Sequence, residues 1–184
     1  MSTKESAVKE SPIRRLSERP PNRKGELAEL AFALKATTLG FSVSKPYGDS
    51  DRYDFIVDSG KRISRVQVKS VGGLHNGVYA ITLQHGKGGL LGPYTPAEID
   101  FLAAYIFPED AWFIFPAEAF NQRRGLHMYP AERGEHGMYD CFREAWCLLA
   151  CARDDYSGIE PVVERRCGRE PGPSDSRRDC PLRK

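Results

Sequence analysis

The sequence predicts an α/β domain in which an N-terminal helix precedes a mixed β-sheet built around a β-hairpin. Three observations predict this fold class. Strong helix formers dominate residues 24–36, two β-branched segments flank a short turn at residues 59–62, and two continuous apolar segments (101–107 and 111–117) have the length of buried strands. The chain has 184 residues, which is enough for one domain with an ordinary core.

The two ends of the chain differ in composition from its middle. Residues 1–24 contain seven Lys/Arg against three Asp/Glu, whereas residues 25–150 contain twelve against fifteen. We therefore expect a basic, flexible arm at residues 1–23, a folded domain at residues 24–152 and a disordered tail at residues 153–184. The prolines of the arm favour a solvated leader; the alternative is a segment that follows a phosphate backbone.

Composition also bears on the compartment. The hydrophobic content of 40% and charged content of 28% are typical of a soluble globular protein. The longest apolar segments are too short to span a bilayer, and residues 1–23 lack the apolar core of a secretory signal. We expect a cytoplasmic protein with no membrane association. The five cysteines have no metal-ligand spacing, so we expect free thiols in a reducing compartment.

The predicted helix at residues 24–36 carries Leu27, Leu30, Ala31 and Leu34 at helical spacing, which makes them its candidate apolar face. Gly40 is a plausible helix stop, and residues 41–43 begin a strand. Turn-forming residues at 46–51 then lead into the hairpin.

The hairpin gathers polar groups on one face. If its turn consists of Gly60 and Lys61, Asp54 lies directly opposite Gln67, and Lys69 shares their face about 6.6 Å further along the strand. A register slip of one residue would move Asp54 to the other face. The face that can be buried carries Phe55, Val57, Val66 and Val68.

These polar groups have two interpretations. A carboxylate and an amide oxygen suit Mg²⁺, which keeps several waters and is often completed by phosphate oxygens. A lysine beside such an ion can orient a water and stabilise charge that develops on a phosphate, as phosphodiester hydrolysis requires. The alternative is a hairpin whose polar face simply meets solvent.

The order and spacing of these residues resemble the PD-(D/E)XK nuclease superfamily. The matching elements are Gly25-x-x-x-Glu29 on the helix, Gly40-Phe41-x-Val43, Tyr53-Asp54 and Gln67-Val68-Lys69. The Gln-x-Lys form resembles the variant in group I intron-associated homing endonucleases, and Holliday-junction resolvases share the same opening elements. The resemblance covers residues 24–120.

The resemblance implies a restriction-endonuclease-like core of helix, strand, β-hairpin and strand, flanked by helices. It also implies an endodeoxyribonuclease that uses Mg²⁺ or Mn²⁺ to cut double-stranded DNA. Asp54 would be the principal metal ligand, with Gln67 and Glu29 as further ligands, and Lys69 the catalytic lysine. Glu26 is the less favoured helix acid. Gln67 departs from the usual acidic residue, which removes one negative charge from the metal site.

The resemblance also bears on the assembly and on alternative functions. Single-domain relatives pair their subunits to cut both strands, so we expect a homodimer or homotetramer. A structure-specific nuclease like the Holliday-junction resolvases is one alternative activity. A DNA-binding module that kept the fold and lost cleavage is another, and a structural or toxin-associated protein of this fold is a weaker one.

The rest of the chain extends the sheet. We expect a third strand of the meander at residues 78–83 and a flexible loop at residues 85–89, in which Lys87 is a candidate DNA contact, as is Lys24 directly after the arm. Residues 101–107 and 111–117 should be buried strands, with Asp100 structural. Aromatic residues at helical spacing predict an amphipathic helix at residues 138–151.

Overall fold

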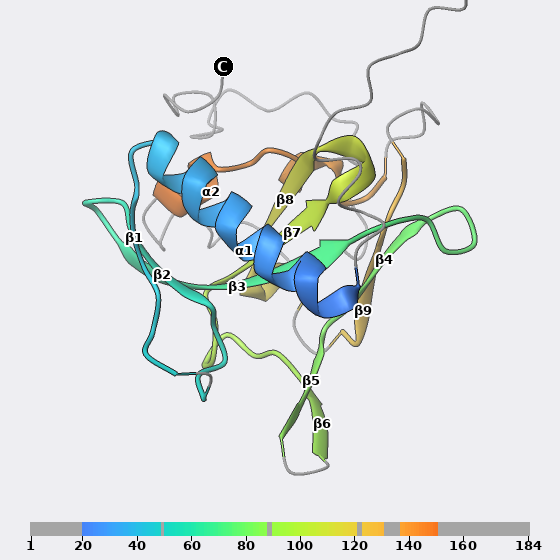
Figure 1. Cartoon of the computed structure of the whole chain (residues 1–184), viewed down its shortest axis with the longest axis horizontal. Coiled ribbons are helices and arrows are strands. Elements are labelled where there is room, and N and C mark those ends of the chain that lie inside the picture. Colours follow the sequence, from blue (N-terminus) through green and yellow to red (C-terminus); the bar gives the residue numbers. More distant parts are fainter. Residues whose placement is uncertain (1–19, 49, 88–89, 121–122, 131–136, 151–184) are drawn as a thin grey trace, which may run out of the picture.

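The computed structural model describes residues 20–150, except 49, 88–89, 121–122 and 131–136. A five-stranded sheet of order β1-β2-β3-β7-β8 forms the centre, and helix α1 crosses one of its faces (Figure 1). Its strands are β1 (Ser42–Ser44), β2 (Phe55–Asp58), β3 (Ile63–Val71), β7 (Phe101–Ile106) and β8 (Ala111–Pro116). Two smaller sheets pair β4 (Tyr79–Thr82) with β9 (Gly125–Met128) and β5 (Gln84–Lys87) with β6 (Leu90–Pro93).

Helix α1 spans Pro21–Thr38, so residues 21–23 of the expected arm are already helical. Proline suits the first turn, since the missing N–H would have no partner there. Gly40 ends the helix with φ of +92°, a left-handed conformation that favours glycine. The rest of the expected arm, up to residue 19, and the expected tail at 153–184 lie outside the described residues.

The face that α1 buries differs in part from the expected one. Leu27 and Ala31 are partly buried against the core as expected, whereas Leu30 and Leu34 are 67% and 72% exposed. The fully buried residues are Ala28, Phe32 and Ala36. Both sets have helical spacing, so periodicity alone could not choose between them. Phe32 decides the orientation because its ring fits among the aromatic rings of Phe55, Trp112 and Trp146.

The hairpin forms with the expected register. Phe55 pairs with Val66 and Asp58 pairs with Ile63, which leaves Gly60 and Lys61 as the turn. Gly60 has φ of +76°, and the Ser59 N–H donates to the Arg62 carbonyl across the turn at 3.0 Å. The hairpin prediction is therefore confirmed, as is the burial of Phe55, Val57, Val66 and Val68.

The expected third strand of the meander is wrong in its pairing. Residues 79–82 do form a strand, β4, but it pairs with β9 outside the central sheet. The position beside β3 belongs to β7, which runs parallel to β3 and is buried at all six residues. A strand buried on both faces suits the sheet interior, whereas β4 alternates buried and exposed residues and needs only one covered face.

The expected loop at residues 85–89 is also corrected in part. Residues 84–87 form β5, which pairs with β6 in a hairpin that projects from the body of the molecule (Figure 1). Residues 88–89, at its tip, lie outside the described residues. The glycines at positions 86, 88 and 89 concealed this strand because glycine is depleted in strands generally.

The helix expected at residues 138–151 does not form as one element. A short 3₁₀ turn (Asp140–Phe142) and one turn of helix α2 (Cys147–Ala150) are separated by a segment that includes Arg143, which is extended, and Glu144, whose φ is +49°. The Trp112 N–H donates to the Glu144 carboxylate and the Glu144 N–H donates to the Trp112 carbonyl, both at 2.7 Å. This segment therefore covers the outer edge of β8, and those backbone bonds replace helical ones.

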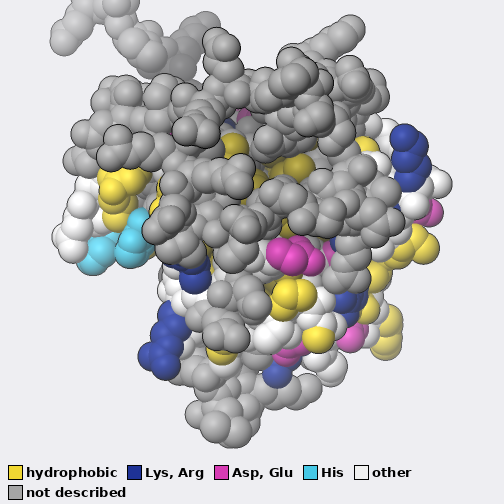
Figure 2. Space-filling view, turned by 180° about the vertical axis from the view of Figure 1, so that it is seen from behind, with side chains coloured by type: hydrophobic (Ala, Val, Ile, Leu, Met, Phe, Trp, Pro, Cys, Tyr) yellow, Lys and Arg dark blue, Asp and Glu magenta, His cyan; other side chains and the backbone are white. Residues whose placement is uncertain are grey.

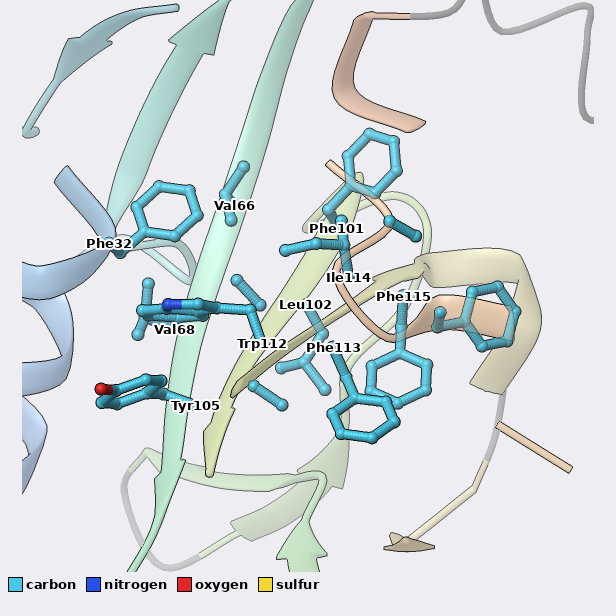
Figure 3. Close-up of a cluster of buried hydrophobic side chains, with 14 of the residues drawn as sticks. Phe32, Val66, Val68, Phe101, Leu102, Tyr105, Trp112, Phe113, Ile114 and Phe115 are labelled. Carbon is cyan, nitrogen blue, oxygen red and sulfur yellow. The ribbon is translucent and has the colours of Figure 1, made fainter. Parts of the chain in front are cut away.

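The core lies on both faces of the sheet. Toward α1, Phe32 lies near Val66 and Trp112 (Figure 3), and Tyr105 stacks on Trp112 with ring centroids 4.5 Å apart. On the other side, Phe115 packs against Tyr139 and Phe142, as the alternation along β8 requires. No helix in the described part of the chain is long and apolar enough to cross a membrane.

Candidate active site

Asp54 and Gln67 meet at the start of the β2–β3 hairpin. The Gln67 amide donates from Nε2 to Asp54 Oδ2 at 2.5 Å, and the backbone N–H of Val68 donates to the same oxygen at 2.7 Å. Gln67 is only 8% exposed, and its Nε2 also donates to the Val68 carbonyl at 3.1 Å. These bonds fix the Asp54 carboxylate through one oxygen, and Oδ1 accepts no hydrogen bond within the described residues.

Lys69 lies two residues beyond Gln67 on β3 and therefore shares its face. Its side chain is half-buried, and its ammonium lies 5.5 Å from the ring centroid of Tyr94. Tyr94 is 4% exposed, and its N–H donates to the Leu83 carbonyl at 3.2 Å, at the base of the β5–β6 hairpin. The aromatic face attracts the cation and restrains its position.

Glu29 reaches this region from α1. Its carboxylate accepts a hydrogen bond from Lys45 at 2.5 Å, and the ammonium of Lys45 lies 5.8 Å from the ring centroid of Phe55. Glu26, the less favoured helix acid, lies 3.6 Å from Arg23 in an ion pair whose side chains are largely exposed. Sequence reasoning did not find Lys45. The signal available was its position, directly after the strand that pairs with β2 beside Asp54.

The charges around Asp54 are coupled. Burial raises the pKa of the Asp54 carboxyl above its ordinary value and the charge of Glu29 raises it further, while the Val68 N–H, Lys69 and Lys45 oppose the rise. The hydrogen bond to Glu29 raises the pKa of Lys45. A carboxyl group desolvated in this way gains stability from any cation that reaches it, which is typical of functional sites.

Comparison with known proteins agrees with the family suggested by these residues. The sequence profile described as PD-(D/E)XK endonuclease matches residues 20–137. The chain belongs to the PD-(D/E)XK endonuclease family. The resemblance and the restriction-endonuclease-like fold expected from the sequence are therefore confirmed.

Solved structures include similar folds. One is a bacterial homing endonuclease, I-Ssp6803I, with a TM-score of 0.64 and 26% identity over 72% of this chain and 94% of that chain. Another is Hjc from Archaeoglobus fulgidus, a Holliday junction resolvase, with a TM-score of 0.39 and 15% identity over 60% of this chain and 94% of that one. A comparison with curated proteins gives no significant match.

The donor set of this PD-(D/E)XK endonuclease fits one hard divalent cation. No group of three His, Cys, Asp or Glu side chains that could hold a metal occurs among the described residues. The oxygen donors near the hairpin are instead the carboxylate of Asp54, the carboxylate of Glu29, which is bound to Lys45, and the amide oxygen of Gln67. Mg²⁺ is commonly held by one or two carboxylates, with water and phosphate oxygens in its remaining positions, so these donors suffice.

The fold brings some of the predicted site residues together and leaves others apart. The hairpin brings Asp54 and Gln67 into contact and puts Lys69 on their face, whereas Glu29 approaches from the helix with its carboxylate bound to Lys45. The candidate DNA contacts lie apart from this group in the chain. Lys24 is in the first turns of α1, and Lys87 is the last residue of β5, where its side chain lies outside the described part of the structure.

Proposed function

We propose that this chain is a metal-dependent endonuclease that hydrolyses phosphodiester bonds in double-stranded DNA, with an activity like that of the homing endonuclease it resembles. The observation that carries the proposal is the contact between Asp54 and Gln67, with Lys69 on the same face, in a chain of this family. A polar hairpin face that merely meets solvent does not account for a Gln67 that is only 8% exposed and hydrogen-bonded to a half-buried carboxylate.

In this proposal Asp54, Glu29 and Gln67 hold Mg²⁺ or Mn²⁺. When bound, the ion supplies a Lewis acid for the phosphate and lowers the pKa of a coordinated water. The hydrogen bonds to Asp54 Oδ2 keep that carboxylate oriented before the ion arrives. Lys69, restrained by Tyr94, orients the attacking water and stabilises the charge that develops on the phosphate.

The DNA contacts and the assembly belong to the same proposal. Figure 2, which views the molecule from behind Figure 1, shows Lys and Arg side chains at separate places on the described part of this face, some of them near Asp and Glu. We therefore expect a few lysines, including Lys24 and Lys87, to contact phosphates.

One chain carries one site, so a homodimer or homotetramer supplies the two cuts of a double-strand break. We place this activity in the cytoplasm.

The first test is cleavage of plasmid and four-way-junction DNA with and without Mg²⁺. Lys69→Ala should reduce the cleavage rate by about 10²–10⁴-fold, the usual effect of a proton-transfer residue. Lys61→Ala, in the turn at the far end of the hairpin, is the matched control and should cut like the wild type. Equal cutting by Lys69→Ala and wild type would contradict the assigned role. The substrate that is cut separates linear-duplex activity from junction activity.

One observation favours a second candidate function, the DNA-binding module without cleavage. Gln67 gives an N–H to Asp54 where the family pattern has a second carboxylate, so the site carries one negative charge less. If wild type binds DNA but cuts none of the substrates with Mg²⁺ or Mn²⁺, the binding module is the correct function. Asp54→Ala separates the two functions further, because it abolishes cleavage and spares a binding activity.

A further inference from the structure

Lys45 is a second lysine at the site, and nothing in the motif assigns it a role. It follows β1 directly, where Ser44 pairs with Ile56, and its ammonium lies 5.8 Å from the ring centroid of Phe55, the residue that follows Asp54. Its side chain is 60% exposed, while that of its partner Glu29 is 25% exposed. The ammonium is therefore open to solvent on one side and bound to a proposed metal ligand on the other.

The contact between Lys45 and Glu29 conflicts with metal binding by Glu29. The ammonium lies 2.5 Å from Glu29 Oε2, where it neutralises the carboxylate charge that a metal ion would use. A cation that binds between Glu29 and Asp54 competes with Lys45 for that charge and lies close to the same ammonium. Two positive groups so close repel each other, so the flexible lysine is the group that moves.

We propose that Lys45 is an exchangeable counter-ion, paired with Glu29 in the metal-free enzyme and with a DNA phosphate once the metal is bound. This inference rests on the proposed function and adds a substrate contact that depends on the metal. Aromatic contact with Phe55 limits the excursion of the ammonium, so the phosphate it reaches is one adjacent to the metal site. No proton transfer is involved, because the lysine remains charged in both states.

Metal binding gives the first test, with Mg²⁺ alone as the probe and calorimetry as the readout. An exposed ion pair contributes little, so Lys45→Met should bind Mg²⁺ about two- to fivefold more tightly than wild type, because Glu29 is no longer occupied. Lys45→Arg, which keeps the ion pair, should bind like wild type. Weaker or unchanged Mg²⁺ binding by Lys45→Met would overturn the first half of the proposal.

DNA binding gives the second test, on a short synthetic duplex in the Lys69→Ala background so that the DNA stays intact. With Mg²⁺, adding Lys45→Met should weaken binding and lower the slope of log K against log salt by about 1, the value of one phosphate contact. Without metal, the parent and the protein with Lys45→Met should have equal slopes, because Glu29 holds Lys45 away from the DNA in the parent. Lys61→Met is the matched control and should leave both slopes unchanged.

The outcomes also separate this inference from the proposed function. Glu29→Gln frees Lys45 without any metal, so its metal-free slope should rise by about 1 relative to the parent. If the parent binds DNA but Lys45→Met has the same slope as the parent with Mg²⁺, the exchange does not occur. If the parent fails to bind DNA at all and wild type cuts none, the proposed function fails, whatever the calorimetry shows.

Discussion

Asp100 shows how one side chain fixes the junction of strands beside the site. Its carboxylate accepts hydrogen bonds from the backbone N–H of Arg65 at 2.8 Å and from the Arg65 guanidinium at 3.1 Å, and it lies 3.7 Å from Arg62. Its own N–H donates to the Arg65 carbonyl at 2.9 Å. The carboxylate therefore holds β3, which carries Gln67 and Lys69, against the start of β7.

The titration of Asp100 makes the stability of the fold pH-dependent. Burial by itself raises the pKa of this carboxyl, but the hydrogen bonds and charge of Arg65, with the charge of Arg62, lower it below its ordinary value. The stabilisation is complete above the unfolded pKa, about 3.9, and is lost as the pH falls through the lower pKa of the folded state. Denaturant unfolding of wild type between pH 7 and pH 3 should show this loss.

Asp100→Asn supplies the comparison. At pH 7 it should lower the free energy of unfolding by about 1–3 kcal/mol, since charged hydrogen bonds are replaced by neutral ones. Its stability should also fall less than that of wild type as the pH drops, because the group that titrates is gone. An equal fall in both proteins would show that other carboxylates account for the acid sensitivity.

At the scale of elements, the part of the fold that could be predicted is the part that local chemistry determines. The turn at Gly60 and Lys61 sets the hairpin register, and the register alone placed Asp54 opposite Gln67. The buried face of α1 depended instead on Phe32 finding three aromatic partners that lie far apart in the sequence. Lys45 entered the site through tertiary packing between β1 and α1, which no local pattern encodes.

The buried face of α1 provides a matched pair of variants. Phe32→Ala removes a fully buried ring and should lower the free energy of unfolding by about 3–5 kcal/mol. Leu34→Ala removes a side chain that is 72% exposed and should change it by less than about 0.5 kcal/mol. Thermal or denaturant unfolding monitored by circular dichroism measures both. A comparable loss in Leu34→Ala would mean that the exposed leucines are covered in the protein in solution.

At the scale of the whole molecule, long-range topology limited prediction from sequence. The segment between β3 and β7 contains β4, β5 and β6, yet β3 pairs in parallel with β7. Two strands that pair in parallel need a long crossover connection between them. When that connection itself contains strand patterns, the sequence favours the prediction of consecutive antiparallel strands, a meander. The same limit applies to the edge of β8, where Arg143 forms a bridge with Phe113 and Glu144 bonds to Trp112 from a distant part of the sequence.

The proposed dimer divides double-strand cleavage between its two subunits. If two subunits each cut one strand, heterodimers of wild type and Lys69→Ala, produced by co-expression, should nick a plasmid and leave it circular. Random pairing at equal amounts gives about one quarter fully active dimers and about one half nicking heterodimers. Gel electrophoresis of the plasmid after treatment with affinity-separated heterodimers distinguishes nicked from linear products. Heterodimers of wild type and Lys61→Ala are the active control and should linearise the plasmid. Linear plasmid from purified heterodimers with Lys69→Ala would show that one site makes both cuts and that pairing serves another purpose.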